Sequence, residues 1–223
     1  MNITLFHLEN SRSQRIVWLL EELGLAYEFG EYGNYLDMPE TLKPVKYPTI
    51  RIEIQDQVIW LAESTAICEF LCEINDDLLP TATSLSEVAD AFFWKSHTDG
   101  SFMHNMALLQ VFNHIDRTAP LVLRPITIPL KLAIRYYHIN KVLMQHLEMI
   151  NEWLEERQWI GGENLTYLDI NIWFPLMAAT ANIDCNPYPN IKRYLDDLSV
   201  RPEYMKAMRV GMWDQEKFKK YWE

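Results

Sequence analysis

The sequence predicts an α+β domain with a small mixed sheet, followed by an all-helical domain. Two observations lead to this prediction. Over the first 80 residues the spacing of apolar side chains changes repeatedly between the period of a strand and that of a helix, whereas beyond residue 80 only the helical period is convincing. The chain has 223 residues, 49% of them hydrophobic, which is enough for one large or two modest cores.

The chain begins with a strand, a helix and a second strand, which together form a βαβ unit. The strands are expected at residues 3–7 and 26–32. Between them, helical spacing relates Ile16, Leu19, Leu20 and Leu23. Gly24 is a natural helix stop. At the helix start, Ser11 and Gln14 have the S-x-x-Q spacing of a capping box, in which the serine oxygen accepts a backbone N–H and the glutamine reaches back.

A hairpin and a helix complete the first domain. Residues 47–54 alternate between apolar and polar side chains, a turn follows at Asp56 and Gln57, and a second strand is expected at 58–61. Residues 63–75 then place apolar side chains along one helical stripe. The order βαβ followed by ββα gives the mixed sheet.

The segment after this helix lacks any period and contains proline, serine and threonine, as linkers do. We therefore expect a first domain at 1–78, a linker at 79–86 and a helical domain at 87–223. Within the helical domain, Thr166 and Asp169 have the spacing of a second capping box.

The composition limits the partners. A formal net charge of -11 and a pI near 5.0 argue against nucleic acid or an anionic membrane as the main partner, because both attract clustered Lys and Arg. The sequence contains no apolar stretch long enough to span a bilayer and no N-terminal signal sequence, so we expect a cytoplasmic protein. Cys68, Cys72 and Cys185 cannot all pair, and we expect three reduced thiols.

Several catalytic motifs are absent from the sequence. Neither G-x-x-x-x-G-K nor G-x-G-x-x-G occurs, so nucleotide binding lacks its usual support. There is also no H-E-x-x-H pair, no Cys/His quartet and no G-x-S-x-G elbow. We therefore expect no metal site, and we interpret the histidines of the helical domain as core or helix-surface residues.

The order and spacing of five segments resemble the cytosolic glutathione S-transferase family along nearly the whole chain. These segments are SRSQRIVWLLEELGLAYE at 11–28, KYPTI at 46–50, LAESTAICEFL at 61–71, HTDGSFM at 97–103 and LTYLDI at 165–170. The chain is most similar to the bacterial and fungal branch with a serine in the first turn. The resemblance implies a thioredoxin-like domain followed by a helical domain, a homodimer, glutathione as co-substrate, a hydrophobic electrophile and no metal.

Two features separate the chain from neighbouring chemistries. Thioredoxin-like disulfide oxidoreductases place C-x-x-C at the start of the first helix, whereas residues 11–14 here are Ser-Arg-Ser-Gln, so a dithiol mechanism is excluded. The tyrosine used by other transferase classes is replaced, since His7 occupies about that position. The loop at 32–46 is also unusual, with Val45 in place of a common glycine.

Ser11 occupies the position where the resemblance implies the thiol-activating serine, with Ser13 and Asn10 as alternatives. Lowering the pKa of a free thiol by about two units requires about 2.7 kcal/mol. A hydrogen bond to a charged group contributes about 1.5–3 kcal/mol and the positive end of a helix about 0.3–1 kcal/mol, which together suffice. Helix capping alone would equally explain a serine at this position.

The remaining glutathione contacts are predicted from the resemblance and from the chemistry of the ligand. Ser64 and the start of its helix are expected to hold the γ-glutamyl carboxylate, and Glu63 the ammonium. Tyr47, before a cis Pro48 that the resemblance implies, is expected to pair with the cysteinyl backbone. Lys46 is expected to reach the glycyl carboxylate. The structural alternatives are a helix cap, a strand-starting proline and a solvated lysine.

The helical domain offers fewer assignments. Asp99 is expected either to approach the γ-glutamyl ammonium from the partner subunit or to be a helix-surface carboxylate. A set of apolar residues could line a second-substrate pocket, although helical spacing more often marks a core: Trp94, Phe102, Met103, Met106 and Phe112. Residues 211–223 either cover the pocket or pack on the helical domain.

Two functional classes remain. The favoured one is an enzyme that conjugates glutathione to hydrophobic electrophiles or uses it to reduce organic peroxides. The alternative is a non-catalytic, transferase-like protein with a stress or regulatory role. The joint presence of Ser11, Tyr47-Pro48 and Glu63-Ser64 favours the enzyme, because a binding scaffold has no need of all three.

Overall fold

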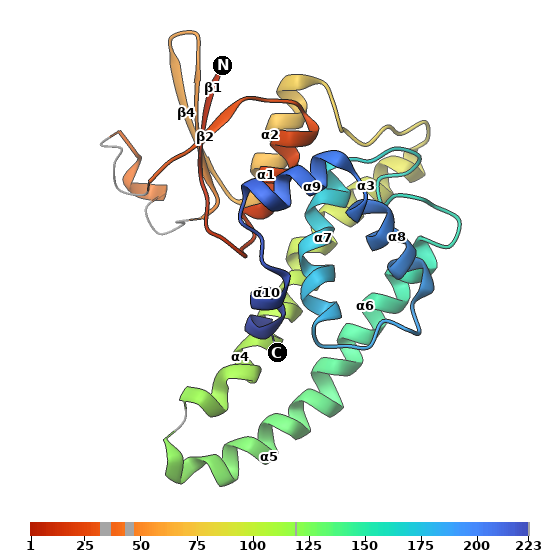
Figure 1. Cartoon of the computed structure of the whole chain (residues 1–223). Helices are drawn as coiled ribbons and strands as arrows, with labels where there is room; N and C mark the ends of the chain where they lie inside the picture. Colours follow the sequence, from red (N-terminus) through yellow and green to blue (C-terminus); the bar gives the residue numbers. More distant parts are fainter. Residues whose placement is uncertain (32–36, 43–46, 119, 223) are drawn as a thin grey trace.

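The fold has the two predicted parts, a mixed four-stranded sheet with two helices and an all-helical domain (Figure 1). The computed structural model describes residues 1–31, 37–42, 47–118 and 120–222, without the side chains of 115–118. The predicted fold class is confirmed.

The sheet has the spatial order β2-β1-β3-β4. Its strands are β1 (Asn2–Phe6), β2 (Tyr27–Phe29), β3 (Thr49–Ile54) and β4 (Gln57–Ala62). β1 and β2 are parallel, as a βαβ unit requires, and the other pairs are antiparallel. Ile3 pairs with Ile52 and Leu5 pairs with Ile50. Since side chains alternate along a strand, these four share one face, and all four are buried in the core.

The helix α1 (Gln14–Glu22) begins later than the predicted cap at Ser11. Its predicted face is confirmed, because Ile16, Leu19 and Leu20 are fully buried. Gly24, with a φ of +62°, ends the segment as expected. The predicted Ser11–Gln14 capping box is wrong: the N-cap is Ser13, no side chain caps the helix, and the buried Gln14 amide donates to the Ala207 carbonyl, 2.8 Å away, instead of reaching back.

The second helix of this domain, α2 (Ser64–Asn75), lies against β3, β4 and α1. A short 3₁₀ turn, η1 (Glu40–Leu42), precedes β3. The inward stripe of α2 comprises Ile67, Cys68, Leu71 and Cys72, all fully buried. The three cysteines of the chain are free, as predicted.

Among the described residues, the helical domain contains eight further α-helices and three short helical turns. They are α3 (Leu85–His97), η2 (Thr98–Phe102), α4 (Met103–Thr118), η3 (Leu121–Leu123), α5 (Arg124–Ile134), η4 (Arg135–Ile139), α6 (Asn140–Trp153), α7 (Tyr167–Thr180), α8 (Pro189–Ser199), α9 (Pro202–Val210) and α10 (Gln215–Trp222). The turns η2 and η4 are π-helical and join their neighbours without a break. α3 starts inside the predicted linker 79–86, because Ser84 accepts the Glu87 N–H as an N-cap.

The helix α7 forms the centre of the helical domain and is buried on nearly all sides. Its predicted capping box is confirmed: Thr166 Oγ1 accepts the Leu168 N–H, and Asp169 accepts the Thr166 N–H at 2.9 Å. The fully buried Asp169 carboxylate also accepts from the Ile160 N–H and the Tyr194 hydroxyl. One buried carboxyl group therefore fixes α7 to α8 and to the loop after α6.

α4, α5 and α6 form a hairpin that projects beyond the rest of the molecule (Figure 1). The helices α1, α7 and α9 pack together at the junction of the two domains. Among the described residues, no helix is both long and apolar enough to cross a bilayer.

A buried histidine, His97, and a half-buried one, His146, form a pair between α3 and α6. His97 Nε2 lies 2.8 Å from His146 Nδ1, and the His97 ring stacks on Phe93 and Phe102. Burial disfavours the charged form, which lowers the pKa of His97 to about 4 and lowers the pKa of His146 as well. Both rings are therefore neutral at pH 7.

This pair makes the fold less stable in acid. In the unfolded chain His97 has an ordinary pKa near 6.5, so between pH 6.5 and about 4 the unfolded state binds more protons, and the free energy of unfolding falls as the pH is lowered. The displacement of the pKa corresponds to roughly 3 kcal/mol. Urea unfolding across this pH range should show that loss in the wild type and a flatter profile in His97→Phe. Identical profiles would contradict the assignment.

Candidate active site

The loop between β1 and α1 holds two serine hydroxyls side by side. Ser11 Oγ lies 2.9 Å from Ser13 Oγ and 2.8 Å from the Leu8 carbonyl, to which it donates. It also accepts the Ser13 N–H at 3.2 Å, a hydrogen bond within the loop that precedes α1. Ser13 is fully buried, whereas Ser11 is partly exposed and lines a pocket. Of the two serines, Ser11 is the one whose side chain a molecule in this pocket could reach.

His7 fixes the direction of these hydroxyl protons. His7 Nε2 lies 2.9 Å from the Gly211 carbonyl, which can only accept, so this nitrogen carries the proton. Burial lowers the pKa of His7 and keeps it neutral, so its Nδ1 accepts the Ser13 O–H at 2.7 Å. The Ser13 proton is thereby committed to His7. The Ser11 proton remains able to rotate from the Leu8 carbonyl toward a ligand.

The C-terminal segment ties this loop in place. The Gln14 side chain donates to the Ala207 carbonyl, and the His7 ring donates to the Gly211 carbonyl. The Asp214 N–H donates to Asn10 Oδ1 at 2.8 Å. Asn10 has a φ of +54°, a conformation that asparagine tolerates better than most residues. Three hydrogen bonds thus join parts of the chain about 200 residues apart.

Arg15 is a fully buried cation that sequence reasoning missed. Its Nη1 donates to the Asn171 carbonyl at 2.9 Å and lies 3.4 Å from Asp99 Oδ1, and its Nη2 donates to Ser64 Oγ at 2.5 Å. Burial lowers the pKa of Arg15, and the Asp99 carboxylate opposes that effect. A guanidinium stays charged nonetheless, so Arg15 holds α1, α2, η2 and α7 together around one charge.

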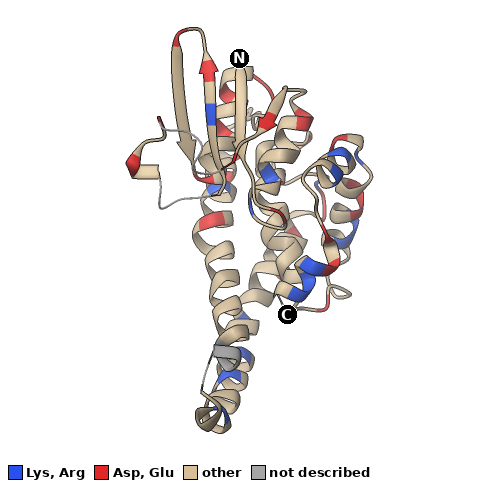
Figure 2. Ribbon diagram, turned by 60° about the vertical axis from the view of Figure 1, so that its left-hand side comes forward, with Lys and Arg blue, Asp and Glu red and all other residues tan. Residues whose placement is uncertain are grey.

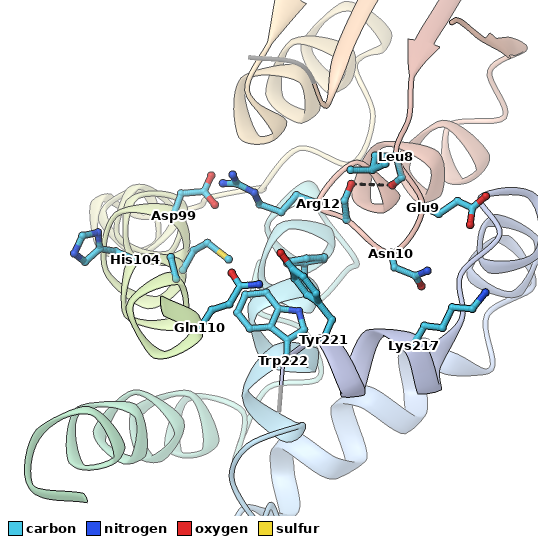
Figure 3. A pocket seen from close by; sticks show the side chains of 14 residues that line it. Leu8, Glu9, Asn10, Arg12, Asp99, His104, Gln110, Lys217, Tyr221 and Trp222 are labelled. Atoms are coloured by element: carbon cyan, nitrogen blue, oxygen red, sulfur yellow. Dashed lines mark hydrogen bonds between the residues drawn. The ribbon is translucent and has the colours of Figure 1, made fainter. Parts of the chain in front are cut away.

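Asp99 lies beside the start of α2 of its own chain. Its Oδ2 accepts the Thr65 hydroxyl, while Oδ1 faces Arg15. The π-helical turn η2 holds Asp99 at this point. Figure 3 shows the Arg12 side chain extending toward the Asp99 carboxylate from the opposite wall. The predicted contact from a partner subunit stays a prediction, since these contacts lie within one chain.

The other predicted residues are placed as follows. Ser64 is the first residue of α2 and is buried, and the exposed Glu63 before it has a φ of +72°, a rare conformation that clusters at functional sites. The Tyr47-Pro48 peptide bond is cis, as the resemblance implied. Lys46 and Val45 lie outside the described residues. The structure brings Ser64 and Asp99 together through Arg15, and it brings Ser11 and Asp99 to one pocket.

That pocket has a volume of about 700 Å³ and lies between the β1–α1 loop, α4 and α10 (Figure 3). Its lining residues are Leu8, Glu9, Asn10, Ser11, Arg12, Asp99, Met103, His104, Ala107, Gln110, Phe174, Lys217, Tyr221 and Trp222. Apolar side chains of α4, α7 and α10 line it together with charged side chains of both signs. Tyr47, Pro48, Glu63 and Ser64 do not line it.

The C-terminal helix both covers the pocket and packs on the helical domain. Tyr221 and Trp222 line the cavity, while the buried rings of Phe218 and Trp222 contact Phe174. Among the apolar candidates named from the sequence, Met103 lines the pocket. The buried Trp94, Phe102 and Met106 belong to the core, as helical spacing favoured.

The cysteines lie away from this pocket. Burial raises the pKa of Cys68 well above its ordinary value and raises that of Cys72 to about 12. Burial also raises the pKa of Cys185. Within the described residues, no group of three or more His, Cys, Asp or Glu side chains could hold a metal ion. A thiol reacting in this pocket must therefore come from a ligand.

The sequence carried one usable signal for Arg15. The residue stands directly before the apolar run 16–20, on a helix whose other residues at 14–20 are all buried. A cation in that position requires buried partners, and Ser64 and Asp99 were both singled out for other reasons. The sequence named residues 211–223 as a possible cover of the pocket but did not single out Lys217 or Tyr221, because α10 reaches the pocket only through long-range packing.

Two family models match the chain. The model for the glutathione S-transferase N-terminal domain matches residues 11–74, and the model for the glutathione S-transferase C-terminal domain matches residues 134–202. Glutathione S-transferase 3 of Schizosaccharomyces pombe is 30% identical over 208 residues, which covers 90% of this chain and 84% of the relative. The disulfide-bond oxidoreductase YfcG of Escherichia coli is 27% identical, covering 92% of this chain and 94% of the relative.

Solved structures are similar over the same extent. A glutathione S-transferase from Actinobacillus pleuropneumoniae has a TM-score of 0.72 and 28% identity, covering 99% of this chain and 98% of its own. A glutathione transferase family member from Pseudomonas fluorescens, crystallised with two glutathione molecules bound, has a TM-score of 0.70 and 21% identity and covers 92% of both chains. At 21% identity, the similarity to the Pseudomonas fluorescens structure shows a shared fold.

The contact between Gly211 and Gln14 provides a test of the hydrogen bond that joins Gln14 to the C-terminal segment. A Cβ at position 211 would clash with the buried Gln14 amide, so Gly211→Ala should displace that amide from the Ala207 carbonyl. We expect a loss of about 1–3 kcal/mol in the free energy of unfolding, measured with urea. The matched control is Gly100→Ala, where no atom lies within 4 Å of the new methyl group. Equal stability of the two variants would contradict a stabilising role for the Gln14–Ala207 hydrogen bond.

Proposed function

Because this chain belongs to the glutathione S-transferase family, whose co-substrate is glutathione, we propose that it activates the glutathione thiol for attack on hydrophobic electrophiles or organic peroxides. One observation carries the proposal. The Ser11 hydroxyl, whose proton is free to rotate, stands at the edge of a cavity of about 700 Å³ that apolar side chains help to line.

In this proposal Ser11 stabilises the thiolate of bound glutathione. The hydroxyl exchanges its hydrogen bond to the Leu8 carbonyl for one to the sulfur. Ser13 cannot donate to the sulfur in its place, since the Ser13 hydroxyl donates its proton to His7. A hydrogen bond to the charged sulfur contributes about 1.5–3 kcal/mol, which lowers the thiol pKa by about one to two units. The thiolate then becomes a major species near neutral pH.

The rest of the tripeptide is proposed to lie along the edge of the N-terminal domain. Ser64 and the α2 N-terminus would receive the γ-glutamyl carboxylate, with Glu63 and Asp99 near its ammonium. The neighbouring Arg15 supports this assignment, because it aligns the Ser64 hydroxyl and adds positive charge behind it. The Tyr47 backbone before Pro48 would pair with the cysteinyl residue, and Lys46 remains the proposed partner of the glycyl carboxylate.

Both proposed reactions conserve atoms and electrons. In conjugation, the thiol proton leaves to solvent, the sulfur forms a bond to the electrophilic carbon, and the leaving group departs with its electron pair. In peroxide reduction, two glutathione molecules are oxidised to the disulfide while the peroxide is reduced to an alcohol and water. The apolar side chains of Met103, Phe174 and Trp222 suit a hydrophobic second substrate.

A second candidate activity is the reduction of disulfides by glutathione. The likeness to the E. coli disulfide-bond oxidoreductase supports it, as does a cavity roomy enough for a disulfide beside the thiolate. The thiolate would attack one sulfur and release the other as a thiolate that takes a proton. A second glutathione would then release the remaining thiol and form glutathione disulfide.

We expect the protein to be retained on immobilised glutathione, to elute with free glutathione, and to turn over at least one of three substrates. These are chlorodinitrobenzene for conjugation, cumene hydroperoxide for peroxide reduction and hydroxyethyl disulfide for disulfide reduction. The substrate that reacts distinguishes the candidate activities. Failure both to bind glutathione and to turn over any substrate would contradict the proposal and favour a non-catalytic stress or regulatory protein.

We expect Ser11→Ala to raise the pKa of the bound glutathione thiol by about one to two units, since the variant loses the hydrogen bond that stabilises the thiolate. The ultraviolet absorbance of the thiolate, titrated against pH in the glutathione complex, measures this directly. Turnover near pH 6.5 should fall roughly tenfold or more, with less loss at higher pH.

The matched control is Ser199→Ala, which removes an exposed hydroxyl at the end of α8. It should leave both the titration and the turnover unchanged. An unaltered thiol pKa in Ser11→Ala, with glutathione still bound, would exclude Ser11 as the activating group and leave Ser13 or Asn10 as candidates.

A further inference from the structure

The two hydroxyls of the β1–α1 loop and the His7 ring form one continuous row of hydrogen-bonding atoms, which we call the hydroxyl relay. Ser11 Oγ lies 2.9 Å from Ser13 Oγ, and Ser13 Oγ lies 2.7 Å from His7 Nδ1. Both links are within the range of about 2.6–3.2 Å over which a proton passes between two heavy atoms. The open end of the relay is at the pocket, where Ser11 is partly exposed.

An acceptor with a free lone pair is present at each step of the relay. The Gly211 carbonyl can only accept, so His7 Nε2 carries the proton and Nδ1 has the lone pair that the Ser13 hydroxyl meets. Ser13 Oγ accepts the Leu8 N–H at 3.0 Å and has a second lone pair for the Ser11 hydroxyl. The Leu8 carbonyl is the competing acceptor, 3.0 Å from Ser13 Oγ, but His7 Nδ1 is nearer.

We propose that His7 takes the proton of the bound glutathione thiol through Ser11 and Ser13, an inference that rests on the proposed function of this pocket. The thiol proton passes to Ser11 Oγ, the Ser11 proton to Ser13 Oγ, and the Ser13 proton to His7 Nδ1. The S–H bond breaks with its electron pair left on sulfur, so a thiolate forms as His7 becomes an imidazolium. The Ser11 O–H then points at the sulfur, and His7 returns its proton to solvent after the thiolate has reacted.

The surroundings of His7 suit a proton acceptor. Burial lowers the pKa of His7, so the ring is neutral before glutathione binds, while the Gly211 carbonyl and the Glu9 carboxylate act in the opposite direction. β2 contributes the uncharged Phe29 ring, stacked on His7 with 5.2 Å between the ring centroids. A thiolate at the other end of the relay adds a negative charge, as in the thiolate–imidazolium pairs of reactive cysteines.

The acidic character of the whole chain favours the same charge state. Figure 2 shows Asp and Glu residues on both domains, and the formal net charge is -11. A negative field over the molecule stabilises a cation within it. The imidazolium is therefore favoured by the thiolate, by Glu9 and by this field, and burial alone opposes it.

A purely structural role accounts for less of this geometry. The Leu8 carbonyl alone would satisfy the Ser13 hydroxyl, so a buried serine at this position does not require an imidazole. His7 instead presents its basic nitrogen to the hydroxyl that leads to the pocket, and a third group, the Gly211 carbonyl, fixes the ring from behind. A base oriented in this way by a third group is the arrangement that activates nucleophiles in enzymes.

Counting protons tests the relay on the wild-type chain. Glutathione is added at about pH 6.5 in weakly buffered solution with a pH indicator, and the thiolate is followed by its ultraviolet absorbance. Because His7 retains the proton, we expect far fewer protons than thiolates to appear. Release of one proton for each thiolate would overturn the relay and leave the proposed role of Ser11 standing. Absence of thiolate on glutathione binding would overturn both.

His7→Gln separates the proton acceptor from the structural contact. The glutamine amide can still donate to the Gly211 carbonyl, but it cannot take a proton. We expect this variant to bind glutathione, to form roughly tenfold less thiolate at about pH 6.5, and to release one proton for each thiolate. Ser13→Ala, which interrupts the relay and keeps His7, should show the same stoichiometry.

The matched control is Ser199→Ala, which should keep the stoichiometry of the wild type, and all three variants should keep its circular dichroism spectrum. Nitrogen-15 NMR of His7 provides a measurement that needs no variant. We expect a neutral ring in the free protein and two protonated ring nitrogens in the glutathione complex. A neutral ring in a complex that contains thiolate would overturn the proposal, as would wild-type stoichiometry in both His7→Gln and Ser13→Ala.

Discussion

The structure depends on one buried cation. Placing a guanidinium in the protein interior costs several kcal/mol unless its donors are satisfied and its charge is balanced. Both terminal nitrogens of Arg15 find partners only when α2 supplies Ser64, η2 supplies Asp99 and α7 supplies a carbonyl, while its buried Nε has no hydrogen-bond partner. These partners bring the thioredoxin-like and helical domains together in one arrangement. The same arrangement orients the hydroxyl at the start of α2, where the γ-glutamyl group of glutathione is proposed to bind.

The position of the reactive hydroxyl depends on a neutral histidine and on the distant C-terminus. His7 orients Ser13, and Ser13 leaves the Ser11 proton available, but His7 keeps its own orientation only because the Gly211 carbonyl accepts from its other nitrogen. The C-terminal segment that supplies this carbonyl continues into α10, which closes one side of the pocket. The geometry of the β1–α1 loop therefore depends on the folding of the C-terminal segment.

Features with a local signal could be predicted from the sequence, and features made by long-range contacts could not. The strands, the buried face of α1 and the Thr166–Asp169 capping box follow from short-range spacing. The Gln14 side chain had a local partner available and took a distant one, because α9 covers the start of α1 and offers a carbonyl in a dry environment. In the candidate site, Ser11, Ser64 and Asp99 were named from sequence, but the residue that connects two of them was not.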